Sequence, residues 1–137
     1  MTDQDLVQKK LVRIQQCVDE LRRLCKPTEI ESNVLMERFA EHTLQIAIQT
    51  ALDVAAHIVS DEGLGEPKTN RDLFILLANH GWISSSMSQT LRDMVGFRNI
   101  IVHGYEIVDP RIVRMIVETR LDDLLTFVSE IHKRMKA

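Results

Sequence analysis

Three side chains that suit phosphodiester chemistry lie within one eight-residue segment of the chain: Arg98, His103 and Tyr105. A histidine titrates near neutral pH, so His103 can move a proton to or from a ribose 2′-hydroxyl or a leaving oxygen. An arginine is permanently charged and forked, so Arg98 can stabilise the charge that develops on phosphoryl oxygens. Chemistry of this kind requires no metal ion, and attack by the 2′-hydroxyl would leave a 2′,3′-cyclic phosphate.

The position of this segment at the end of a predicted helix limits how its side chains can meet. In a continuous helix, five residues correspond to about 140° around the axis, so Arg98 and His103 would point apart. Gly104 allows the chain to leave the helix, which could bring His103 back towards Arg98. A purely structural interpretation stays open, because arginine and histidine in a last helical turn also interact favourably with the helix dipole. Tyr105 could likewise simply pack at the helix end.

Helical periodicity predicts the elements that must position these residues. Residues 4–26 and the segment that follows Pro110 each carry an apolar seam with the spacing 4-3-4-3-4. The seam of the last helix is formed by Val113, Val117, Arg120, Leu124, Phe127 and Ile131. Shorter helices are expected from Asn70 to Gly81 and from Ser84 to near Gly104. We predict an all-α fold, an antiparallel bundle of four or five helices in a single domain over residues 1–137.

A further predicted helix, over residues 33–60, is apolar on nearly every side. Such a helix is typical of the centre of a bundle or of a subunit interface. Asp53 and His57 are spaced i, i+4 on this helix, so their side chains share one face. They could orient Arg98 or line a cleft between two subunits. They could equally be a satisfied polar pair at an interface.

Charge and motifs argue against several classes of function. The net charge of −3 gives no overall attraction to nucleic acid, although residues 92–120 hold five arginines and four acidic residues, a local charge of +1. The five histidines form no zinc-binding array, and no glycine-rich phosphate loop is present. We therefore expect no metal and no cofactor.

The chain is expected to be cytoplasmic. Its acidic, polar N-terminus differs from a signal peptide, and no apolar run approaches the roughly 20 residues of a membrane span. Cys17 and Cys25 are eight residues apart in a predicted helix, which places them about 12 Å apart, too far for a disulfide. Two free thiols favour a reducing compartment.

The segment also resembles a known family. The pattern Arg98-x4-His103-x-Tyr105 is similar to the R-x(4–6)-H-x-Y motif of HEPN-domain ribonucleases. Asn99 also resembles the polar residue that commonly follows the arginine in this family. The sequence around the motif, residues 94–105, looks like that of the minimal HEPN toxins of the HepT type. Residues 44–58 resemble the second helix of those toxins. The likeness covers most of residues 5–135.

This resemblance implies a function that composition does not show. It implies a prokaryotic homodimer in which two Arg–His sites face one another and cut RNA, tRNA in at least some members, with Arg98 and His103 as catalytic residues. It also implies a partner, an MntA-type nucleotidyltransferase antitoxin that adds AMP to Tyr105. Each AMP would bring negative charge and bulk to the site. The alternatives are a non-catalytic nucleotide-binding or accessory module of a nucleotidyltransferase, and a plain structural bundle.

Overall fold

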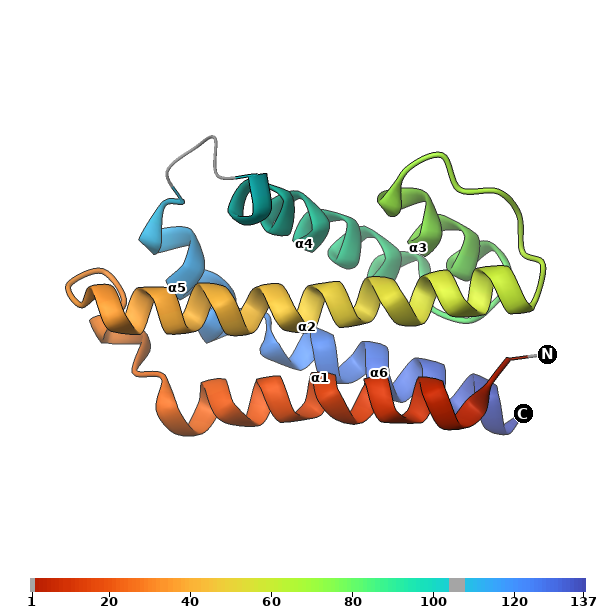
Figure 1. Ribbon diagram of the computed structural model, residues 1–137, viewed down its shortest axis with the longest axis horizontal. Coiled ribbons are helices and arrows are strands. Elements are labelled where there is room, and N and C mark those ends of the chain that lie inside the picture. Colours follow the sequence, from red (N-terminus) through yellow and green to blue (C-terminus); the bar gives the residue numbers. More distant parts are fainter. Residues whose placement is uncertain (1, 104–107) are drawn as a thin grey trace.

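The computed structural model describes residues 2–103 and 108–137, and for residues 101–103 the backbone alone (Figure 1). These residues form helices and contain no strand, so the predicted all-α class is confirmed. The helices are α1 (Gln4–Leu24), the short 3-10 helix η1 (Pro27–Glu29), α2 (Val34–Asp61), α3 (Asn70–Asn79), α4 (Ser85–His103), α5 (Pro110–Thr119) and α6 (Leu121–Lys136). None of the described helices is long and apolar enough to cross a membrane.

Helix α2 lies at the centre of the molecule. It packs against α1, α3, α4 and α5, and Figure 1 shows it running along the whole length of the structure. Buried side chains follow one another around the helix, among them Ala40, Leu44, Ala47, Ile48, Ala51, Val54, Ala55 and Ile58. The prediction of a central helix from its apolar surface is therefore confirmed.

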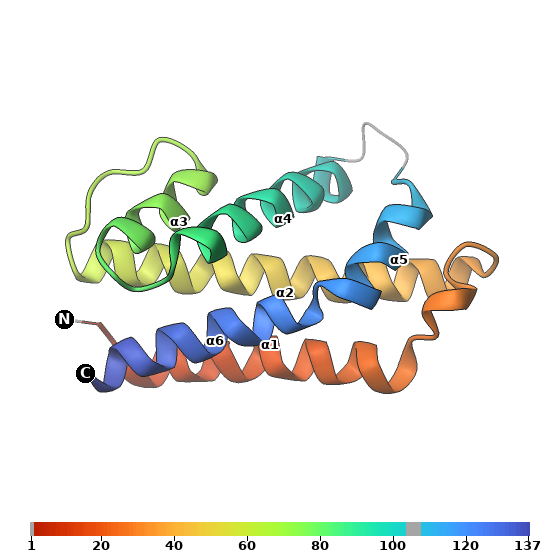
Figure 2. The same ribbon diagram turned by 180° about the vertical axis from the view of Figure 1, so that it is seen from behind.

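The other helices cover α2 from two sides. Helices α1 and α2 form an antiparallel pair joined through η1, and α6 returns beside α1 (Figure 2). The two ends of the chain therefore lie at the same end of the molecule. Helices α3 and α4 pack against each other and against the opposite side of α2. Phe74 of α3 meets Phe127 of α6 edge to face across the core, with ring centroids 6.1 Å apart.

Helix boundaries follow local chemistry. Asp109 caps α5 by accepting a hydrogen bond from the Arg111 backbone N–H at 2.9 Å, and Pro110 occupies the first helical position. The Ser84 hydroxyl accepts from the Met87 N–H at 3.1 Å at the start of α4. Cys17 and Cys25 are both free and buried, and burial raises the pKa of each thiol.

The last predicted helix is two helices in the structure. The chain breaks between Thr119 and Leu121, so there are six α-helices in the described residues, one more than the upper limit expected. The predicted seam placed Arg120 among apolar residues, but Arg120 is exposed and Leu121 is buried. The break allows a charged side chain to leave the seam while α6 turns its own apolar face towards α1 and α4.

Candidate active site

Arg98 projects from α4 towards α2, and its guanidinium is held by two neutral acceptors. Its Nη1 donates to the Asn99 Oδ1 at 3.1 Å, and its Nη2 donates to the Gln49 Oε1 of α2. The Arg98 Nε is buried and has no hydrogen-bond partner among the described residues. No described carboxylate forms an ion pair with this arginine, so its charge is available for an anion.

Asp53 is connected to Arg98 through a single residue, Gln49. Its Oδ1 accepts from the Gln49 Nε2 at 3.0 Å, and its Oδ2 lies 3.7 Å from the Lys10 Nζ of α1. A continuous chain of polar contacts therefore runs from Lys10 through Asp53 and Gln49 to Arg98. The structure thus brings together three of the residues singled out from the sequence: Asp53, Arg98 and Asn99.

Gln49 and Lys10 are the members of this network that the sequence analysis missed, and Gln49 is the one that contacts Arg98. A half-buried glutamine in an apolar helix has no motif of its own. One signal was present: Gln49 is spaced four residues before Asp53, as His57 is spaced four residues after it. Following that spacing in both directions would have placed Gln49 on the same ridge.

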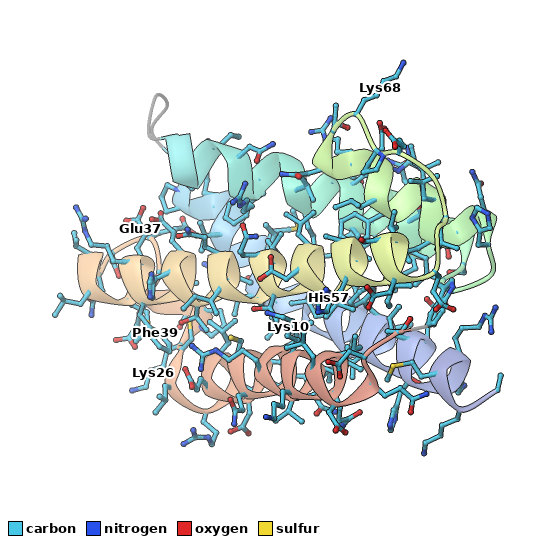
Figure 3. The ribbon with its side chains drawn as sticks, turned by 45° about the vertical axis from the view of Figure 1, so that its right-hand side comes forward. Lys10, Lys26, Glu37, Phe39, His57 and Lys68 are labelled. Carbon is cyan, nitrogen blue, oxygen red and sulfur yellow. The ribbon has the colours of Figure 1, made fainter. Side chains whose placement is uncertain are left out.

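His57 stays outside the network. It lies between α2 and α1, on the side of Lys10 (Figure 3), and its Nε2 is buried without a hydrogen-bond partner among the described residues. Asp53 pairs with Gln49 and Lys10, and no hydrogen bond between Asp53 and His57 is formed. The two residues share a helix ridge but do not form the satisfied pair that their spacing allowed.

The second half of the motif is only partly within the described structure. His103 is the last residue of α4, so residues 98 and 103 are positions on one helix, about 140° apart. The side chain of His103, and Gly104 and Tyr105 as a whole, lie outside the described residues. The expected approach of His103 to Arg98, and the role of Tyr105, therefore stay predictions.

A pair of carboxyl groups lies on α2, nearer its N-terminus. Burial of Glu41 and a hydrogen bond to Glu37 raise the pKa of the Glu41 carboxyl from 4.5 to about 7, although Arg38 acts in the opposite direction. Glu37 points from α2 towards the side of α4 and α5 (Figure 3). A carboxyl that stays protonated near neutral pH reduces the negative charge of this surface. Among the described residues, no three histidine, cysteine or acidic side chains are grouped so that they could hold a metal ion.

Comparison with known proteins identifies the family. The family described as Ribonuclease HepT-like matches residues 14–131. The mRNA nuclease HepT of Shewanella oneidensis is 30% identical over 128 residues, which make up 93% of this chain and 96% of that protein. The chain belongs to the ribonuclease HepT-like family.

Two further comparisons also match HepT proteins or HEPN toxins. The tRNA nuclease HepT of Aphanizomenon flos-aquae is 29% identical over 101 residues, 74% of this chain and 69% of that protein. The solved structure of the tri-AMPylated Shewanella oneidensis HEPN toxin in complex with an MNT antitoxin matches with a TM-score of 0.88 at 29% identity, covering 97% of this chain and 99% of that one. The resemblance noted from the motif is thus confirmed, and this HepT-like chain is a ribonuclease with the fold of the HEPN toxins.

Proposed function

We propose that this HepT-like ribonuclease is the toxin of a toxin–antitoxin pair and cuts RNA with Arg98 and His103. The observation that carries the proposal is the guanidinium of Arg98, which is held by neutral acceptors and keeps its charge, five residues before His103. Asn99 supports Arg98 through a direct hydrogen bond, and Asp53 supports it through Gln49. His57, with its unpartnered Nε2, is assigned to the lining of a cleft between two copies.

The proposed reaction is transfer of the phosphodiester to the neighbouring ribose oxygen. The 2′-oxygen forms a bond to phosphorus, the bond from phosphorus to the 5′-oxygen breaks, and a 2′,3′-cyclic phosphate and a 5′-hydroxyl result. His103 moves the proton between these oxygens, and Arg98 stabilises the extra negative charge on the phosphoryl oxygens. The two HepT relatives described above are an mRNA nuclease and a tRNA nuclease, so tRNA is tested beside mRNA as the substrate.

The proposed assembly is a cytoplasmic homodimer in which the two copies bring their α4 motifs to a shared cleft. Exposed apolar side chains support a protein contact near this end of the molecule: Ile100 of α4, two residues after Arg98, is 38% exposed, and Ile112 and Met115 of α5 are 45% and 44% exposed. We expect light scattering to give the mass of two chains.

The proposed off-switch is AMPylation of Tyr105 by a nucleotidyltransferase antitoxin of the MntA type. The solved relative carries three AMP groups and is bound to an MNT antitoxin, which supports this proposal. Each AMP adds a negative charge two residues from His103 and would repel RNA. After co-expression with the candidate antitoxin, the intact mass should rise in steps of one AMP, and Tyr105→Phe should remove the steps. An unchanged mass of the native chain would contradict this mode of neutralisation.

Expression in a bacterial host tests the toxin assignment. The native chain alone should arrest growth, and Arg98→Ala or His103→Ala should relieve the arrest while the protein still accumulates in folded form. His42→Ala, an exposed histidine on α2, is the matched control and should stay toxic. Persistent growth arrest with both motif variants would refute the assigned residues.

A further inference from the structure

The chain of polar contacts across α1, α2 and α4 reaches Arg98 through Gln49, a residue outside the motif. We propose that Gln49 is a positioning residue for Arg98 and that Asp53 sets the orientation of its amide. This inference rests on the proposed catalytic role of Arg98. It adds a residue on α2 to a site whose motif lies entirely on α4 and the residues that follow it.

The direction of each hydrogen bond supports the orientation. The guanidinium of Arg98 can only donate, so it requires the oxygen of the Gln49 amide. An ionised Asp53 can only accept, so it takes the amide nitrogen of Gln49, at 3.0 Å. Both contacts are satisfied by a single orientation of the amide. The Lys10 Nζ, 3.7 Å from the other Asp53 oxygen, places this carboxylate between α1 and α2.

The place of Gln49 in the fold makes it more than a second acceptor. Asn99, the other partner of Arg98, is the adjacent residue of the same helix and moves with it. Gln49 is the only partner that connects the guanidinium to another helix within the described residues. Since α2 is the central helix of the bundle, this contact fixes the position of Arg98 relative to the core.

The chemical type of Gln49 also matters. A carboxylate at this position would hold the guanidinium by charge and offset the positive charge that the reaction uses. An amide holds it by a hydrogen bond and leaves that charge for the phosphoryl oxygens. The N–H groups of Nη1 and Nη2 that do not bond Asn99 or Gln49 are then left for an anion, whereas the Nε is buried.

The first arm of the test is kinetic. Gln49→Met keeps the length and helical preference of the side chain but removes the acceptor, so it should lower kcat for cleavage of a synthetic RNA about 10- to 100-fold, with KM changed less than about threefold. Gln45→Met is the matched control, because Gln45 is also half-buried, lies one turn earlier on α2 and forms no hydrogen bond with the described residues. It should leave both constants unchanged.

The second arm does not depend on activity. An anchored guanidinium gives separate NMR signals for its Nη protons, whereas a freely rotating one gives an averaged signal. The Arg98 signals, assigned by their loss in Arg98→Lys, should be separate in the native protein, averaged in Gln49→Met and separate again in Gln49→Glu, which restores an acceptor.

The two arms separate failure of this inference from failure of the proposed function. Unchanged kcat and unchanged Arg98 signals in Gln49→Met would overturn the role of Gln49. Averaged signals with unchanged kcat would also overturn it, because the anchor would then not serve the reaction. If Arg98→Ala cleaves RNA normally, the proposed function fails, and the NMR signals still decide whether Gln49 anchors Arg98.

Discussion

At the scale of single residues, the site depends on how a permanently charged side chain is held without being neutralised. Arg98 is restrained by an amide on each side, and the nearest carboxylate in the chain of contacts, Asp53, is separated from it by Gln49. This arrangement keeps neutral acceptors in contact with the guanidinium, and Gln49 separates it from the negative charge of Asp53. A fixed, unpaired arginine is suited to stabilise charge that develops only in a transition state.

Asp53 provides a direct test of this arrangement. Asp53→Asn can accept or donate, so it no longer fixes the orientation of the Gln49 amide, and we expect the rate of RNA cleavage to fall about 3- to 10-fold. Asp93→Asn is the matched control, because the Gln89 Nε2 donates to the Asp93 Oδ1 at 3.0 Å with the same i, i+4 spacing on the exposed surface of α4. Equal effects of the two variants on the cleavage rate would contradict the role of Asp53.

The residues of the site differ in how far sequence alone predicted them. Arg98 and Asn99 could be selected because the types and spacing of the motif are distinctive. Asp53 could be selected because an acidic residue is conspicuous in an apolar helix. Gln49 was harder to select: its i, i+4 spacing to Asp53 is visible in the sequence, but its contact with Arg98 becomes apparent only when packing brings α4 against α2. The pairing of Asp53 with His57 was open from their spacing. Of the two competing contacts, the one to Gln49 lies within α2 and has the same i, i+4 spacing, and the one to Lys10 of α1 is tertiary.

At the scale of elements, α2 combines a structural and an electrostatic role. Its apolar residues form the centre of the bundle, and its half-buried polar residues face α4 on one side and α1 on the other. The Glu37 and Glu41 pair belongs to this polar part of α2. Because one of these carboxyl groups retains a proton near neutral pH, the helix is less acidic than its sequence suggests.

The Glu41 carboxyl predicts how stability depends on pH. Its pKa is raised to about 7 in the folded protein, so the folded state binds more protons than the unfolded state between about pH 4.5 and 7. Its contribution is therefore fully present below pH 4.5 and is lost as the pH rises through 7. We expect Glu41→Gln to remove this loss and to raise the free energy of unfolding at pH 8 by about 1 kcal/mol, after allowance for solvent screening.

Urea unfolding at pH 5 and pH 8 measures this effect. The native protein should lose more stability between the two pH values than Glu41→Gln does. Glu66→Gln, in the exposed loop before α3, is the control and should follow the native protein. The assignment is wrong if Glu41→Gln shows the same pH dependence as the native chain.

At the scale of the whole molecule, the two sides of the bundle are joined through the core. Phe74 and Phe127 meet edge to face with an interplanar angle of 87°, and both side chains are fully buried. Phe127→Ala should therefore lower the free energy of unfolding by about 3 to 5 kcal/mol, a large fraction of the stability of an ordinary domain. Phe39→Ala, at a half-buried position between α2 and α1 (Figure 3), should cost less than half as much. Equal losses in denaturant titrations would contradict this description of the core.

The overall architecture was predictable because few residues break the helical periodicity, whereas one boundary was not. The seam after Pro110 keeps its spacing through Arg120, so nothing local indicates a break. The break arises from packing: Leu121 is buried in place of Arg120, and α6 turns to lie along α1, where Arg22 and Asp122 form an ion pair.

Cleavage of RNA by the purified protein tests the central claim most directly. Total RNA incubated with the native chain in the presence of a metal chelator should be cut to products that end in a 2′,3′-cyclic phosphate. Arg98→Ala and His103→Ala should be inactive while their circular dichroism and unfolding transitions match those of the native protein. Undiminished cleavage by both folded variants, or cleavage only after a divalent metal is added, would contradict the account.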